Sequence, residues 1–335
     1  MFRYLQMINF GALKKILIIR FSSIGDIVLT SPIIRCLKNT YPDATIHYLT
    51  KQQYATIIAN NPAVDKVYTI AKEIDEVITE LKKEDYGFVV DLHHNLRTFR
   101  LKQKLGQPNA TFPKLNPQKF LLTTFKWDKM PAIHVVDRYF KAVEKLGVSN
   151  DNKGLDFFIS DQGNVNLEEY GIVSPYIAFS IGAQFATKRL PTEKIIELVS
   201  KINAPVVLLG AAADKENANA IKAQSQNVIN LCGELSLEQS ASVIQQAAKV
   251  VSHDTGLMHI ASAFQKEIIS IWGNTVPALG MYPYLPQDAA KYSIHEVKLS
   301  CRPCSKIGYQ ACPKKHFKCM ENQDLDAIAE VVNTV

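Results

Sequence analysis

Two kinds of hydrophobic pattern alternate along the chain. Short runs of β-branched and other apolar residues predict strands in the first half at Ile16–Arg20, Thr45–Leu49, Lys66–Ile70 and Tyr86–Asp91. The second half predicts further strands at Tyr176–Ile181, Val206–Leu209, Val228–Asn230, Lys249–Ser252 and Ile268–Ile271. Segments of helical length and periodicity separate them, which is typical of parallel, doubly wound α/β sheets. The pattern therefore predicts two such domains in tandem.

A polar stretch interrupts this alternation near the middle of the chain. It comprises Ser149–Gly154 and Asp161–Asn166, and such stretches commonly link domains. We expect an N-terminal domain over residues 1–160 and a C-terminal domain over residues 161–335. The last helix, Asp324–Val332, is expected to cross back to the first domain.

Length and composition fit two ordinary globular cores. The chain has 335 residues, of which 47% are hydrophobic, and no apolar run reaches the roughly 18–20 residues of a membrane-spanning helix. The N-terminal sequence MFRYLQMINFGALKK lacks the apolar core of a secretory signal. These features predict a cytoplasmic protein whose six cysteines are reduced or bind a metal.

The net charge of +6 is concentrated in one segment, residues 97–129. Against the single acid Asp128, this segment carries Arg97, Arg100, Lys102, Lys104, Lys114, Lys119, Lys126 and Lys129. Aromatic residues are interleaved with these cations, which is the composition of a surface for an anionic, amphipathic partner such as the inner membrane. The alternative is a solvated helix face with a few core aromatics. We expect no nucleic-acid partner.

The first strand leads into a turn of small residues, within the sequence FSSIGDIVLTSPIIRCL. Ser22, Ser23 and Gly25 come at the carboxyl end of a parallel strand, where ligands bind in open α/β sheets. Asp26 lies on the first turn of the helix that follows, where the helix dipole alone favours an acid. The chain contains neither G-x-G-x-x-G nor G-x-x-x-x-G-K-[ST], so the sequence does not support assignment to the dehydrogenases or the P-loop NTPases.

Two loops in the second half carry groups suited to a nucleotide. The loop GAQFATKRLP begins at Gly182 and contains Lys188, which can either bind a phosphate or remain an exposed charge. In the loop LLGAAADKENANAI, Asp214 or Glu216 can bind the hydroxyls of a ribose or cap the next helix.

A third loop, in HDTGLMHIAS, has the form of an anion-binding helix start. Asp254 and Thr255 can cap a helix that opens at Gly256, whose first amides would then face a diphosphate. His253 and His259 flank this element and are either ligand contacts or buried, satisfied histidines.

Four cysteines cluster near the C-terminus. Cys301, Cys304, Cys312 and Cys319 have the spacing C-x-x-C-x7-C-x6-C, which suits a tetrahedral structural zinc site. The alternative is a set of reduced, packed thiols.

Several of these segments together resemble glycosyltransferase family 9, the ADP-heptose:lipopolysaccharide heptosyltransferases. The resemblance is carried by SSIGDIVLTSPIIRCL, DLHHNLRT, HVVDRY, SIGAQFATKRLP, HDTGLMHIASA and CRPCSKIGYQACPKKHFKCM. It implies a GT-B fold, in which two Rossmann-like doubly wound domains face a central cleft. It further implies inverting, metal-independent transfer of heptose from ADP-L-glycero-D-manno-heptose to an acceptor in the lipopolysaccharide core, linked to lipid A.

The resemblance also assigns roles to individual positions. It implies that Asp26 is the catalytic base and that Lys188 stabilises the leaving diphosphate. The implied donor-binding residues are Gly182, Lys188, Glu216, Asp254, Thr255, Gly256 and His259. The implied acceptor-binding residues are Ser22, Ser23, Gly25, Asp91 and Arg97. Family members often have tryptophan after the lysine, where this chain has Arg189 and Leu190.

Three other functions remain compatible with the sequence. They are transfer of a different sugar within the same fold, epimerisation of a nucleotide sugar, and non-catalytic binding of a nucleotide sugar.

Overall fold

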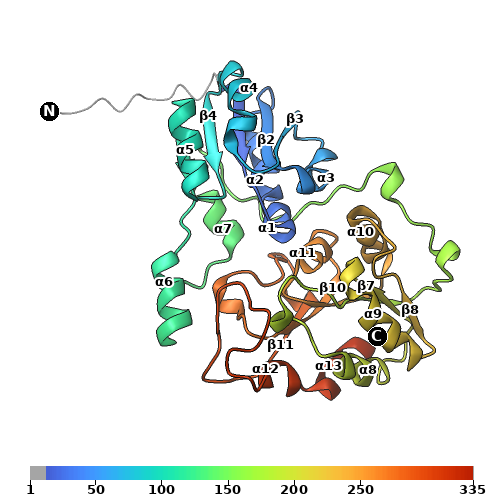
Figure 1. Ribbon diagram of the computed structural model, residues 1–335. Coiled ribbons are helices and arrows are strands. Elements are labelled where there is room, and N and C mark those ends of the chain that lie inside the picture. Colours follow the sequence, from blue (N-terminus) through green and yellow to red (C-terminus); the bar gives the residue numbers. More distant parts are fainter. Residues whose placement is uncertain (1–12, 335) are drawn as a thin grey trace. The chain divides into compact units, whose positions relative to one another are not determined.

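Two parallel β-sheets organise the computed structural model, which describes residues 13–334 (Figure 1). The first sheet belongs to a unit formed by the described part of Met1–Lys114 together with Val136–Asp151. The second sheet belongs to a unit formed by Leu115–Val135 and the described part of Asn152–Val335. Among the described residues, no helix combines the length and the apolar character needed to cross a bilayer.

The first unit contains a five-stranded sheet in the order β3-β2-β1-β4-β5. Its strands are β1 (Lys15–Ile19), β2 (Thr45–Lys51), β3 (Lys66–Ile70), β4 (Phe88–Asp91) and β5 (Asn109–Thr111). Its helices are α1 (Ile24–Val28), α2 (Ser31–Thr40), α3 (Thr56–Ala59), α4 (Ile78–Lys83), α5 (Leu96–Leu105) and α7 (Val135–Phe140), the last of which begins at the boundary with the second unit. The four strands predicted in this half are confirmed, and β5 was not predicted.

The central strand β1 is apolar on both faces, as a sheet covered by helices on both sides requires. Leu17 and Ile19 point to the face that also holds Phe21 and Leu81. Strand β1 pairs with β2 on one side and with β4 on the other, so the chain reverses its direction of winding between β1 and β4. Such a reversal places the loops after these two strands beside a crevice where ligands bind.

The helical pattern after β1 is divided into two helices. Helix α1 has only five residues, and α2 begins at Ser31 with Pro32 in its first turn. Proline suits the first turn of a helix but removes a backbone donor and clashes with the preceding turn inside one. The short α1 therefore positions Asp26 but is too short to develop the dipole of a full helix.

The second unit contains a six-stranded parallel sheet in the order β11-β10-β9-β6-β7-β8. Its strands are β6 (Ile177–Ser180), β7 (Val206–Leu209), β8 (Val228–Asn230), β9 (Lys249–His253), β10 (Glu267–Trp272) and β11 (Tyr292–Glu296). Its helices are α6 (Asn116–Phe120), the π-helical turn Leu121–Phe125, α8 (Thr192–Val199), α9 (Lys215–Ala223), α10 (Leu237–Gln246), α11 (Gly256–Ala263), α12 (Lys318–Glu321) and α13 (Leu325–Asn333). The five predicted strands are confirmed, and β11 was not predicted.

Short 3₁₀ turns complete both units. They are Gln52–Tyr54, Ile74–Glu76, Glu144–Leu146, Asp161–Gly163, Leu167–Tyr170, Ala186–Lys188, Ala212–Asp214, Pro277–Leu279 and Ala289–Lys291.

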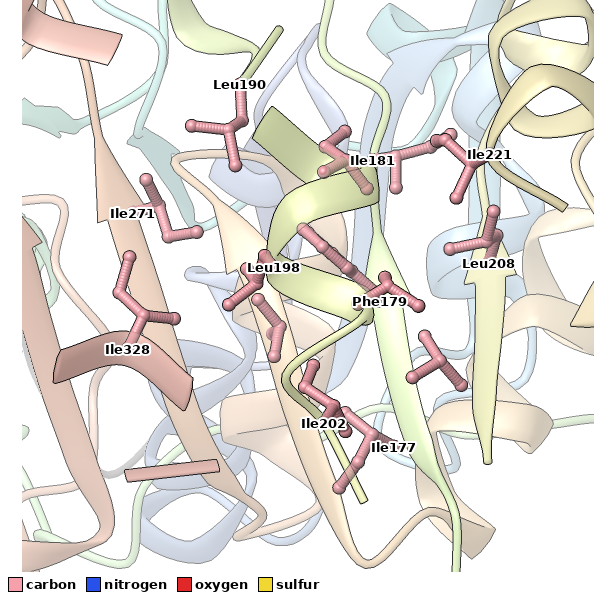
Figure 2. Packing of buried hydrophobic residues seen from close by; sticks show 14 of the residues in the cluster. Ile177, Phe179, Ile181, Leu190, Leu198, Ile202, Leu208, Ile221, Ile271 and Ile328 are labelled. Carbon is pink, nitrogen blue, oxygen red and sulfur yellow. The ribbon is translucent and has the colours of Figure 1, made fainter. Parts of the chain in front are cut away.

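Both faces of the second sheet carry a hydrophobic core. Ile177 and Phe179 of β6 pack on one face with residues of α8, α9 and α13, among them Leu198, Ile221 and Ile328 (Figure 2). Ala178, which alternates with them, packs on the opposite face with residues of α10 and α11. The winding of this sheet reverses between β6 and β9, so the loops after these strands flank its ligand-binding edge.

Helix α13 was expected to cross back to the first domain. In the structure its apolar face packs against α8 and β10 of the second unit. The side chain of Asn333 fixes its end there, because its Nδ2 donates to Lys201 O at 2.8 Å and its Oδ1 accepts from Asn203 N at 3.0 Å.

The stretch Leu115–Val135 also belongs to the second unit, although the sequence groups it with the first domain. Val135 N donates to Gly280 O at 2.9 Å, and His134 Nε2 donates to Tyr282 O at the same distance. Residues 128 and 130–133 line an apolar pocket of about 300 Å³ together with residues around β11.

Candidate active site

The carboxylate of Asp26 is held from two sides in the turn after β1. Arg20 Nη2 lies 2.6 Å from Asp26 Oδ1. The hydroxyl and the amide of Ser23 donate to Asp26 Oδ2 at 2.8 and 3.2 Å. The side chain keeps 23% of its surface exposed, so this oriented carboxylate can also reach a substrate hydroxyl.

Arg20 is a buried cation that joins the two turns at the ligand-binding edge of the first sheet. Its Nε donates to Ser22 O at 2.8 Å and its Nη1 to Leu92 O at 2.5 Å. Burial by itself lowers the pKa of Arg20, but the Asp26 carboxylate and the neighbouring Tyr139 and Tyr48 outweigh it and the pKa is raised. Arg20 therefore stays charged and fixes Asp26.

Asp91, expected to bind the acceptor, is sequestered at the end of β4. Its side chain is 1% exposed and lies 2.9 Å from Lys102 Nζ. Its Oδ1 accepts the amides of His93 and His94 at 3.0 and 2.8 Å. The carboxylate thus builds its own turn, and its contact with an acceptor stays a prediction.

The other residues expected to bind the acceptor lie around the β1 turn. Ser23 is exposed, Ser22 is half-buried, and Gly25 is buried within α1. The half-buried Arg97 donates to Lys72 O at 2.8 Å and stacks over the ring of Phe21, 5.3 Å from its centroid. The exposed Ser23 thus offers a polar group beside Asp26, and Arg97 offers a guanidinium over Phe21 of the same turn.

In the second unit, Lys188 and Asp254 form an ion pair across the reversal point of the sheet. Lys188 follows β6 and Asp254 follows β9, and Lys188 Nζ lies 2.6 Å from Asp254 Oδ2. The same ammonium group donates to Asp254 O at 3.2 Å. The loop lysine is therefore held at the start of α11 and is not a freely moving surface charge.

Helix α11 begins at Gly256, as the sequence predicts, but Asp254 and Thr255 do not cap it as expected. Asp254 Oδ2 accepts from Thr275 Oγ1 at 2.8 Å, in addition to its contact with Lys188. Thr255 occupies the N-cap position, yet among residues 13–334 its side chain makes no capping hydrogen bond. A helix start without a side-chain cap leaves its first amides for water or an anion.

The two histidines that flank this element are both buried. Leu190 N donates to His253 Nε2 at 3.0 Å, which places the proton of this imidazole on Nδ1. Burial, reinforced by Arg189, lowers the pKa of His253 to about 3. His259 lies inside α11 with 2% of its surface exposed, and its contact with the donor stays a prediction.

Asp214 closes the turns after β6 and β7. Its Oδ2 accepts from Ala211 N at 2.9 Å, and its Oδ1 lies 3.5 Å from Arg189 Nη1. A Cβ atom at Gly182 would lie 2.2 Å from Asp214 Oδ2, so Gly182 is required because the carboxylate occupies that space. Glycine at this position is therefore explained by the approach of Asp214, and its contact with the donor stays a prediction.

Glu216, assigned to the ribose, lies exposed on the first turn of α9. Between the two acids of this loop, the structure places Asp214 in the architecture of the turn and leaves Glu216 on the surface.

Arg302 and Thr275 shape the site but were not singled out in the sequence. Arg302 is 8% exposed and its Nη2 donates to Thr275 O and to Glu296 Oε2, both at 2.8 Å. Its Nε donates to Gly273 O. Because Thr275 in turn holds Asp254, the buried arginine supports the ion pair with Lys188. In the sequence, the only indication of this role is that Arg302 lies inside the CRPC motif, whose cysteines suggest a metal site instead.

The four late cysteines give no support to the zinc alternative. Within the described part of the chain, no group of three or more His, Cys, Asp or Glu side chains is arranged to hold a metal ion. Cys304 Sγ donates to Cys301 O at 3.2 Å, while Cys301 Sγ faces His316 Nε2 at 3.8 Å. Cys319 is buried in the core, and this burial raises its pKa to about 11.

Comparisons with known proteins identify the family of the chain. The family model described as glycosyltransferase family 9 (heptosyltransferase) matches residues 74–311. Lipopolysaccharide heptosyltransferase 2 of Salmonella typhimurium is 27% identical over 303 residues, which cover 78% of this chain and 84% of that protein. Lipopolysaccharide heptosyltransferase 1 of Pseudomonas aeruginosa is 26% identical over 326 residues, covering 87% of this chain and 86% of that protein.

Solved structures are similar in fold. The structure of E. coli ADP-heptose lps heptosyltransferase II matches with a TM-score of 0.67 and 20% identity, covering 96% of this chain and 100% of that one. A glycosyl transferase family 9 structure from Veillonella parvula matches with a TM-score of 0.69 and 22% identity, covering 84% and 85%. The chain therefore belongs to glycosyltransferase family 9, the heptosyltransferases, and is a glycosyltransferase with the GT-B fold.

Proposed function

We propose that the enzyme transfers heptose from ADP-L-glycero-D-manno-heptose to an acceptor in the inner core of lipopolysaccharide, with inversion at the anomeric carbon. The observation that supports binding of the donor is the Lys188–Asp254 ion pair at the start of α11, which has no side-chain cap. A cation beside free helix amides is suited to a diphosphate. Related structures are described with ADP and with ADP-2-deoxy-2-fluoro heptose, which supports an ADP sugar as the donor here.

We assign the acceptor to the turn after β1, within the domain proposed to span residues 1–160, and the donor to the domain proposed to span residues 161–335. On the acceptor side, Ser23 beside Asp26 and the half-buried Arg97 over Phe21 supply polar groups in this turn. On the donor side, we assign the diphosphate to the helix start at Gly256 and the ribose hydroxyls to Glu216 on the first turn of α9.

The reaction follows from the charges placed in these turns. Asp26 accepts the proton of the acceptor hydroxyl as that oxygen forms its bond to the anomeric carbon. The bond from this carbon to the donor phosphate breaks on the opposite side, and the electron pair leaves with ADP. Lys188 and the first amides of α11 stabilise the negative charge that develops on the diphosphate. The positive charge needed by the leaving group thus comes from the chain itself, without a catalytic metal.

The decisive test measures ADP release with purified ADP-heptose and heptose-deficient lipopolysaccharide. Asp26→Asn should lower kcat about 10²–10⁴-fold, the usual contribution of a general base, at a temperature where the variant is fully folded. Its melting temperature should also fall, because the buried Arg20 loses its charged partner. Full turnover by this variant would refute the assignment of the base. A thermal-shift screen of ADP-, GDP-, UDP- and dTDP-sugars should select the ADP sugar, and preference for another nucleotide would refute the proposed donor.

One further activity has some support from the fold. The UDP-GlcNAc 2-epimerase from Methanocaldococcus jannaschii matches with a TM-score of 0.52 and 14% identity. Epimerisation would change the donor sugar without an acceptor, whereas transfer requires one. Analysis of the products with and without lipopolysaccharide distinguishes the two, and non-catalytic binding would give no product in either case.

A further inference from the structure

The stretch 116–129 of the second unit forms a short helical arm, α6 and the π-helical turn that follows it (Figure 1). These two elements pack chiefly on each other. Leu122 is the arm's buried hydrophobic residue. Lys126 Nζ anchors the end of the arm by donating to Pro303 O at 2.7 Å.

The arm displays three large aromatic side chains to solvent. Phe120, Phe125 and Trp127, here called the aromatic patch, are 57%, 52% and 62% exposed. Phe120 and Phe125 contact each other edge to face at 5.8 Å between centroids, and Phe125 and Trp127 lie 5.4 Å apart. The rings are therefore ordered by their mutual contacts, although they remain outside the core. A contiguous exposed group of this kind marks an interaction surface.

The charges around the aromatic patch indicate the kind of partner. Lys119, Lys126 and Lys129 alternate with the rings along this stretch, and Asp128 is its acidic residue. Asp128 Oδ1 accepts the amide of Met130 at 2.9 Å. Aromatic rings beside lysines favour the boundary of an anionic bilayer, where the rings enter the headgroup region and the cations contact lipid phosphates.

We propose that the aromatic patch, together with Lys119 and Lys129, docks the enzyme on the surface of an anionic membrane. A second copy of the chain is a poorer partner, because pairing the same surface would bring two sets of lysines together. Three rings also cover much less than the roughly 800 Å² that each partner buries in a stable protein interface. The proposal goes beyond sugar transfer and does not depend on it.

The two tryptophans of the chain make the proposal directly measurable. Trp127 is 62% exposed, whereas Trp272 is fully buried and serves as an internal reference. When the full-length protein is titrated with phosphatidylcholine vesicles containing phosphatidylglycerol, the emission of Trp127 should shift to the blue. Brominated lipids should quench it. Trp127→Phe should abolish both signals, and vesicles of pure phosphatidylcholine should bind at least tenfold more weakly.

Matched surface variants separate this docking from a general effect on the protein. The double variant Phe120→Ser, Phe125→Ser should lower vesicle affinity on the order of tenfold, and each of Lys119→Gln and Lys129→Gln roughly fivefold. The controls are Val173→Ser and Lys222→Gln, which change an exposed apolar residue and an exposed lysine elsewhere in the same unit. Emission of Trp272 reports that each variant remains folded. Equal vesicle binding by patch and control variants would overturn the proposal, as would a blue shift that depends on protein concentration in the absence of lipid.

Discussion

The guanidinium of Arg20 lies 2.6 Å from the carboxylate of Asp26 and also donates to Leu92 O, so one buried cation connects the proposed base to the turn after β4. Arg20 is thus a positioning residue. We expect Arg20→Met to lower kcat at least tenfold with little change in KM. It should also reduce the free energy of unfolding by about 3 kcal/mol, because the carboxylate and two carbonyl groups lose their partner.

Arg20→Lys provides the control, because it restores the charge but only part of the hydrogen bonding. Partial recovery of kcat by lysine, measured as ADP release together with denaturant unfolding, would support positioning through charge. If the methionine and lysine variants both have the kcat of the native enzyme, Arg20 has no part in orienting Asp26.

Removal of the Lys188 charge should weaken nucleotide binding. In Lys188→Met the diphosphate loses a charged hydrogen bond, which is worth about 1.5–3 kcal/mol. ADP affinity measured by calorimetry should therefore fall roughly 10- to 100-fold. The control Lys194→Gln removes an exposed lysine of α8 that pairs with Glu197. An unchanged ADP affinity in the methionine variant would contradict the proposed donor site.

Gly182 should tolerate no side chain, because its Cβ would meet Asp214 Oδ2 at 2.2 Å. Gly182→Ala is expected to reduce the free energy of unfolding by about 1–3 kcal/mol through overpacking. Gly171→Ala is a control in which the loss of stability has a different cause. Its φ of +66° disfavours alanine by about 1 kcal/mol, although no atom obstructs the new methyl group. In a thermodynamic cycle, prior replacement of Asp214 by Ala should reduce the cost at Gly182, and additive costs would disprove the steric explanation.

Acid should destabilise the second unit through His253. Burial lowers the pKa of this imidazole in the folded protein to about 3, whereas in the unfolded chain it is about 6.5. Between these values the unfolded chain binds the extra proton. Stability should therefore fall as the pH drops below about 6.5, by about 1.4 kcal/mol per pH unit from this residue.

Denaturant unfolding of His253→Gln between pH 6.5 and 5 provides the measurement. Glutamine can still accept the amide of Leu190 but does not titrate, so the pH slope of the variant should be smaller than that of the native protein. Identical slopes would show that His253 is not the group responsible.

Much of the fold follows from local pattern. The predicted strands, including Ile16–Arg20 and Lys249–Ser252, alternate apolar side chains toward two covered faces and have helices between them, so periodicity alone is sufficient. The two strands that were missed are edge strands. Asn109–Thr111 is only three residues long, and Tyr292–Glu296 is partly exposed and polar. Such strands are defined by pairing with a distant neighbour, which their own sequences do not reveal.

The site divides in a similar way. Lys188 and Asp254 follow strands that meet at the reversal point, so topology predicts their approach. Asp91 and Asp214 have equally suitable sequence positions, yet both carboxylates bind the amides of their own turns. An acid that builds a turn and an acid that binds a ligand have the same local sequence signature. Distant hydrogen bonds, such as those of Arg302, distinguish the two roles only in three dimensions.

The stretch Leu115–Val135 leaves the first unit, joins the second, and is followed by a return of the chain to the first unit at Val136–Asp151. Neither unit is therefore a continuous piece of polypeptide, and no single cut would release an intact half. A fragment starting at residue 152 would lack Val135, whose amide donates to Gly280 O. It would also lack the residues that form one wall of the apolar pocket. During synthesis, this stretch can likewise dock only after the β10–β11 region has emerged, so the second unit cannot be completed until β11 has been translated.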